Sequence, residues 1–122
     1  MRRLAVAALL AGTALLVPAA PAAAACPGNA SDSLQERLRA ADGAIVAHMV
    51  KRSGRVRTYV LDTRVKGDIG TRVRVRATPG CAPAARKGRR IGLLLDRRSG
   101  RWHTASRALR PGELLKAAGI GP

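Results

Sequence analysis

One alternating run near the middle of the chain does most to limit the possible folds. Between residues 71 and 77, Arg72, Arg74 and Arg76 alternate with small apolar residues. Side chains of a β-strand point in turn to opposite faces, so the run predicts a strand with one basic and one apolar face. Four further runs have strand composition, with turn residues between them: residues 44–51, 55–65, 91–95 and 101–105. Five strands without intervening helices predict an all-β fold, a small barrel or sandwich.

Short helices are predicted on either side of these strands. Ser33 stands three residues before Glu36, the spacing of a capping box, and Leu34 and Leu38 then fall on one helical face. Near the other end, Pro111 suits the first turn of a helix that carries Leu114 and Leu115. The fold class is therefore all-β with small helices.

The first 25 residues have the pattern of a secretory signal peptide. Arg2 and Arg3 precede an apolar run, residues 4–17, that is shorter than the roughly 20 residues of a membrane-spanning helix. Small residues, Ala23 to Ala25, then provide a cleavage site. The prediction is a signal peptide over 1–25 and a single domain over 26–122. No later segment is apolar for long enough to cross a membrane, so the mature protein is expected to be secreted or attached to the cell surface.

Cys26 and Cys81 are the only cysteines of the chain. In an oxidising compartment an even number of cysteines indicates a disulfide, here between the first residue after the leader and the far side of two strands. Lipidation of Cys26 is the alternative. It would leave Cys81 as an odd thiol, and Ala23 stands where a lipoprotein signal usually has leucine. The sequence favours the disulfide but leaves both possibilities open.

Several of these features occur together in one known family. An N-terminal cysteine after the leader is followed by a short helix and by five characteristic segments, residues 41–46, 59–61, 65–70, 73–75 and 88–95. From Cys26 to about Ala105 the chain resembles the netrin-like domain, the OB-type barrel shared with tissue inhibitors of metalloproteinases. The resemblance implies a five-stranded OB-type closed barrel and a secreted bacterial member of that family.

The resemblance also implies an alternative function, metalloprotease inhibition. In inhibitors of the family the first cysteine chelates the catalytic zinc through its amino group and carbonyl oxygen, a role that falls on Cys26. The next residue enters the specificity pocket of the protease, and here it is Pro27. The chain departs from the pattern at Gly28, which stands where these inhibitors have a second cysteine.

The charge of the chain predicts an anionic partner. Lys and Arg number 23 against 7 Asp and Glu, a formal net charge of +16. Such an excess favours polyanions, and export makes an anionic envelope or extracellular polymer the main expectation. The candidate contact residues are Arg64, Arg72, Arg74, Arg76, Arg86, Lys87, Arg89 and Arg90, with a further cluster at Arg97, Arg98 and Arg101.

Single-stranded nucleic acid is a weaker expectation because base stacking needs aromatic side chains. Tyr59 and Trp102 are the only aromatic residues, and Trp102 is expected to fill one end of the barrel. The two histidines, His48 and His103, lie in no recognisable catalytic or metal-binding motif. The chain is therefore predicted to be a non-enzymatic, monomeric binding protein without a metal or cofactor.

Overall fold

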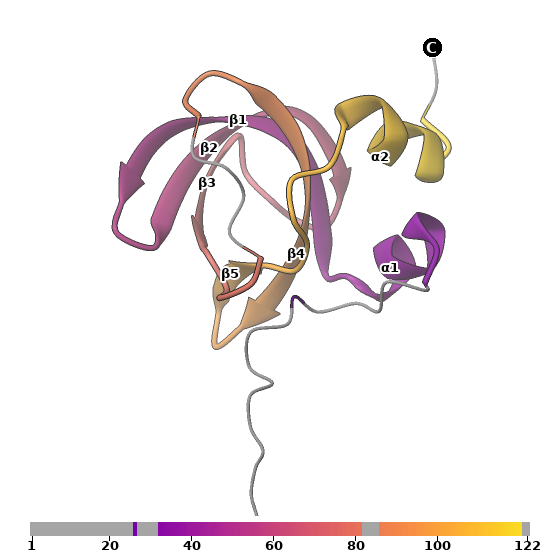
Figure 1. Ribbon diagram of the computed structural model, residues 1–122, viewed down its shortest axis with the longest axis horizontal. Helices are drawn as coiled ribbons and strands as arrows, with labels where there is room; N and C mark the ends of the chain where they lie inside the picture. Colours follow the sequence, from indigo (N-terminus) through magenta and orange to yellow (C-terminus); the bar gives the residue numbers. More distant parts are fainter. Residues whose placement is uncertain (1–25, 27–31, 82–85, 121–122) are drawn as a thin grey trace, which may run out of the picture.

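The computed structural model describes residue 26 and residues 32–81 and 86–120. These contain two helices and five strands (Figure 1): α1 (Leu34–Ala40), β1 (Gly43–Ser53), β2 (Val56–Lys66), β3 (Arg72–Arg76), β4 (Arg90–Arg98), β5 (Arg101–Thr104) and α2 (Pro111–Ala117). The predicted signal peptide lies outside the described residues. The strands and helices occur where the sequence predicts them, although β4 is longer at both ends than the apolar run 91–95.

The five strands form a closed barrel in the order β1-β2-β3-β5-β4. The fold class is therefore confirmed as an OB-type closed barrel with small helices. Strand β1 pairs with both β2 and β4, and closure at the opposite side comes from a short parallel pairing of β3 with β5. That pairing joins only Val75 to Trp102 and Arg76 to His103. Three register shifts along the β1–β2 ladder curve β1, as β-bulges do at the bends of small barrels.

Two apolar clusters lie on opposite sides of the barrel wall. The interior cluster is built from alternate residues of the strands, joined by Ile69 from the β2–β3 connection: Ile45, Ala47, Met49, Tyr59, Ile69, Val73, Val75, Leu93 and Leu95. The second cluster lies outside β1 and β4, where α1 and α2 cover the wall side by side (Figure 1). It contains Val46, Leu94 and Leu114, with Leu34 and Leu38 of α1 against it. Because both faces of β1 are covered here, residues 43–47 are buried without alternation.

Local signals in the sequence agree with the local geometry. Ser33 and Glu36 make the reciprocal hydrogen bonds of a capping box, and Pro111 occupies the first turn of α2. Ser99 and Gly100 both have positive φ and join β4 to β5 in a two-residue hairpin. Gly67 has φ 93°, and a Cβ there would lie 2.9 Å from the Asp42 carbonyl oxygen. The turn between β2 and β3 therefore needs glycine for both backbone conformation and space.

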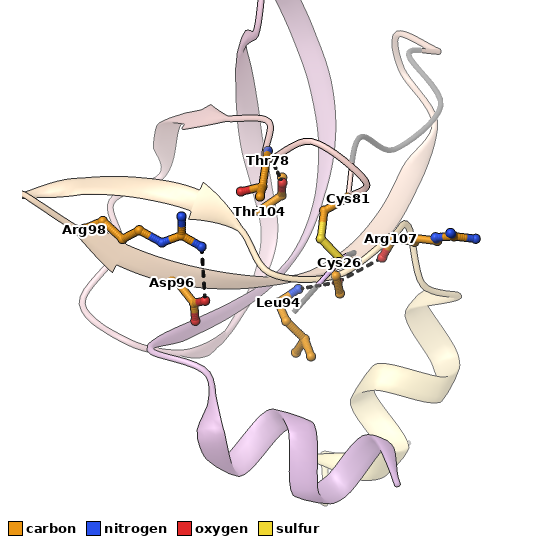
Figure 2. Close-up of a disulfide and its surroundings, with 9 residues drawn as sticks. Cys26, Thr78, Cys81, Leu94, Asp96, Arg98, Thr104 and Arg107 are labelled. Atoms are coloured by element: carbon orange, nitrogen blue, oxygen red, sulfur yellow. Dashed lines mark hydrogen bonds and ion pairs between the residues drawn. A yellow bond between two sulfur atoms is a disulfide. The ribbon is translucent and has the colours of Figure 1, made fainter. Parts of the chain in front are cut away.

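A disulfide joins Cys26 to Cys81, as predicted (Figure 2). Cys81 is fully buried, directly after the turn that follows β3. This turn is tied to β5 because the Thr78 amide donates to the Thr104 Oγ1 at 2.8 Å. Cys26 is thereby attached to the part of the barrel where β3 and β5 meet.

Candidate anion-binding sites

The three arginines of β3 point to solvent in a regular row. Arg72, Arg74 and Arg76 are exposed, while Val73 and Val75 between them are buried in the barrel. The alternation predicted from the sequence is confirmed. Successive outward residues of a strand lie roughly 6.5–7 Å apart, so the row presents guanidinium groups at about that spacing.

Two more cations, one from β1 and one from β5, line grooves beside this row. A groove of about 520 Å³ on the β2 side is lined by Lys51 together with Arg72 and Arg74. A second groove, of about 490 Å³, is lined by the same arginines, Arg76, Arg101 and Trp102 on the β5 side. We call Lys51, Arg72, Arg74, Arg76 and Arg101 the β3 basic face. It extends across three strands that are distant in sequence.

Acidic residues lie elsewhere on the barrel. The ion pairs within 4.0 Å among the described residues join Asp62 to His48 and Arg90, and Asp96 to Arg98. None of them involves the β3 basic face. No described carboxylate therefore makes an ion pair with these cations, which favours binding of an external anion.

Arg64 does not extend the β3 row across the hairpin. Pairing of β2 with β3 ends where Val60 faces Arg72, four residues before Arg64. The Arg64 Nε donates to the Ile69 carbonyl oxygen at 2.6 Å, which holds its side chain against the turn between the two strands. Arg64 thus has a structural contact that the sequence prediction did not include.

The other predicted cluster, residues 86–90, lies at a separate cavity of about 200 Å³. Arg86, Arg89 and Arg90 line it, whereas Lys87 does not. Sequence analysis missed Arg110, which joins these three arginines from the segment before α2. No local sequence signal could have revealed Arg110, because a tertiary contact places it at the cavity. Two backbone hydrogen bonds between Gly92 and Leu109, of 2.8 and 2.9 Å, hold the segment before α2 against β4. We call this the arginine-rimmed cavity.

A buried arginine lies inside the barrel next to this cavity. Arg57 is only 5% exposed, and its Nε and Nη1 have no hydrogen-bond partner among the described residues. It is two residues from Tyr59, a cavity-lining residue that points to the same interior. Burial raises the pKa of the Tyr59 phenol, while the charge of Arg57 and a hydrogen bond from it act to lower that pKa. Arg57 and Tyr59 are therefore in direct electrostatic contact.

His103 lies among the cations of the β3–β5 side. Partial burial lowers its pKa, and the positive charges of Arg98, Arg76 and Arg101 lower it further, against a smaller opposing effect of Asp96. Beside it, the guanidinium of Arg97 stacks over the Trp102 ring, 5.3 Å from the centroid. Trp102 is half-buried and packs against the interior cluster.

The remaining predicted sites stand as follows. Cys26 forms the disulfide, and Pro27 lies outside the described residues. His48 Nδ1 lies 3.1 Å from Asp62 Oδ2 on the barrel surface. Within the described parts of the chain, no three His, Cys, Asp or Glu side chains gather into a metal-holding group. In the same residues, no helix has the length and apolar character needed to span a membrane.

Neither a protein-family model nor a curated protein matches this chain. The netrin-like resemblance rests on short motifs and stays a prediction. The closed barrel is shown by the pairing of the five strands.

Proposed function

We propose that the chain is an exported, non-enzymatic protein that binds an anionic polymer of the cell envelope or extracellular space through the β3 basic face. The observation that carries the proposal is the row of Arg72, Arg74 and Arg76, exposed at regular spacing and without an ion pair among the described residues. A linear polyanion has regularly repeated charges, so a straight row of guanidinium groups can contact several of them at once. Arg101 and Lys51 widen the contact on both sides.

Export is part of the proposal for two reasons. The predicted signal peptide directs the chain out of the cytoplasm, and disulfides such as Cys26–Cys81 persist in oxidising compartments. Anionic polymers are abundant partners there, whereas most cellular nucleic acid is not accessible.

Replacing Arg72, Arg74 and Arg76 together by Gln is expected to weaken binding to heparin, used as the probe, by roughly a hundredfold. The estimate takes about 1 kcal/mol for each cation at an anionic surface. The slope of log affinity against log salt concentration should also fall by about two to three, because fewer counterions are released. Heparin titrations at several salt concentrations measure both quantities.

The matched control carries the same charge change away from the face. Arg39 and Lys116 lie on α1 and α2, and Arg107 lies between β5 and α2; all three are exposed. Substituting these three residues by Gln should preserve most of the affinity for heparin. Equal losses of heparin affinity in the two triple variants would mean that net charge alone determines binding. Unchanged heparin affinity of the Arg72, Arg74 and Arg76 variant would reject this face as the site.

The protonation of His103 gives an independent readout of the same binding. Anionic groups near Arg76 and Arg101 would offset the charges that lower the His103 pKa, so binding should raise this pKa toward its ordinary value near 6.5. By linkage, the complex takes up a proton and affinity increases as the pH falls through the interval between the free and bound pKa values. NMR titration of the imidazole with and without heparin tests this. No change at saturation would place the polymer elsewhere.

The disulfide supports a second candidate function, inhibition of a metalloprotease by the exported N-terminus. A bond to the buried Cys81 restrains Cys26, which lowers the entropy cost of placing its amino group on a protease zinc. Adding one alanine before Cys26 in the exported protein is expected to abolish any inhibition, because the free amino group moves away from the fixed residue. Equal potency of the extended protein against the same protease would eliminate this mechanism.

A further inference from the structure

The arginine-rimmed cavity combines two kinds of surface that the β3 basic face does not. Its inner wall is apolar: Met49 is 4% and Tyr59 1% exposed, with Ile91 and Leu109 beside them. Around this wall stand the exposed side chains of Arg86, Arg89, Arg90 and Arg110. The cavity shares no lining residue with the two grooves of the β3 basic face.

The size of the cavity limits what it can hold. Its volume is about 200 Å³. An apolar cavity of about 150 Å³ accommodates benzene, and drug-sized ligands need about 300 Å³ or more. One ring or a short aliphatic chain with a single polar head group therefore fits.

The charge around the cavity determines the sign of that head group. Arg90 is partly compensated by Asp62, with 3.8 Å between Nε and Oδ2. Arg86, Arg89 and Arg110 make no ion pair among the described residues. A guanidinium group can donate two parallel hydrogen bonds to the oxygens of a carboxylate or phosphate. Three arginines without an ion pair therefore favour an anionic head group.

Arg57 adds positive charge from inside the barrel. A buried charge without a partner is unfavourable, and a nearby anion lowers that cost. Tyr59 connects Arg57 with the cavity, because it lines the cavity and also interacts with the Arg57 side chain. In the low-dielectric interior this charge is screened less than the surface arginines are.

From these observations we propose that the arginine-rimmed cavity is a binding site for a small organic anion, a ring-sized apolar group carrying a phosphate or carboxylate. The apolar part contacts Met49, Tyr59 and Ile91, and the head group is held by Arg89 and Arg110. This site acts independently of polymer binding on the β3 basic face.

The test compares three probes by calorimetry and NMR. Phenyl phosphate should bind at least tenfold more tightly than inorganic phosphate, which lacks the apolar part, and than phenol, which lacks the charge. Arg110→Gln should weaken phenyl phosphate binding at least tenfold. Lys87→Gln is the matched control, since Lys87 is exposed in the same segment but does not line the cavity. The Lys87→Gln variant should bind phenyl phosphate with the affinity of the parent protein.

Arg57→Met provides a variant with opposite effects on stability and binding. Removing a buried charge that has no counter-ion among the described residues should raise Tm by several degrees, while phenyl phosphate binds more weakly. A lower Tm together with unchanged binding would remove Arg57 from the proposal. Equal affinities for phenyl phosphate and inorganic phosphate, or equal losses in Arg110→Gln and Lys87→Gln, would overturn the site. Heparin binding distinguishes the two proposals, because Arg110→Gln should leave it nearly unchanged.

Discussion

Replacing Cys26 and Cys81 together by alanine should lower the free energy of unfolding by about 4 kcal/mol. The disulfide closes a loop with a sequence separation of 55 residues, which includes α1, β1, β2 and β3. In the loop-entropy model, removing such a cross-link gives the unfolded chain many more conformations. For a domain of this size the loss corresponds to a decrease in Tm of roughly 15–30 °C. Urea and thermal unfolding measure both quantities.

Two comparisons distinguish the effect of losing the cross-link on stability from the effect of changing the two side chains. Treating the parent protein with a reductant should give nearly the same loss, because it opens the same loop without changing the packing around Cys81. The alanine variant should not respond to the reductant. A double variant as stable as the oxidised parent would show that the unfolded chain is already compact or that β1 to β3 are held without the disulfide.

Leu114→Ala is expected to cost about 2–5 kcal/mol, the range for truncating a fully buried leucine. Leu114 is the buried residue of α2, and it packs with Val46 and Leu94 on the outer wall of the barrel. Its loss leaves a cavity between α2 and β4. Leu115→Ala should cost clearly less, since Leu115 is only partly buried. Chemical denaturation of the two variants measures the difference.

Gly92 makes this prediction more specific. A Cβ at Gly92 would lie 3.0 Å from Leu114 Cδ2 and 3.2 Å from Leu114 Cβ. Gly92→Ala should therefore destabilise the parent protein by about 1 kcal/mol or more, as overpacking does. In the Leu114→Ala background Leu114 Cδ2 is gone while the Cβ remains, so the same substitution should cost less than in the parent protein. Additive effects of the two substitutions would contradict the close packing of α2 on β4.

The candidate sites differ in how far the sequence could predict them. The Arg72–Arg76 row follows from strict alternation along one strand, and it is exposed as expected. The arginine-rimmed cavity depends on a contact between residues 86–91 and 108–111, which no periodicity encodes. Arg57 was missed because both faces of β2 carry apolar residues in the sequence: Val56 and Val60 lie on one face, and Tyr59 lies with Arg57 on the other. In the closed barrel, Arg57 shares the interior side with Tyr59, and Val56 and Val60 are only half-buried.

Local chemistry in the sequence determined the strands, the turns at Gly67 and Gly100 and the capping box at Ser33, and it favoured the pairing of the two cysteines. Each of these depends on residues a few positions apart or on the only two thiols present. Tertiary packing decided the rest: closure of the barrel sets which face of β2 is interior, α1 and α2 cover the outer face of β1, and the segment before α2 brings Arg110 to the other cavity arginines. These depend on packing between segments far apart in the chain, and on β2 the burial of Tyr59 outweighs the preference of the neighbouring Arg57 for water.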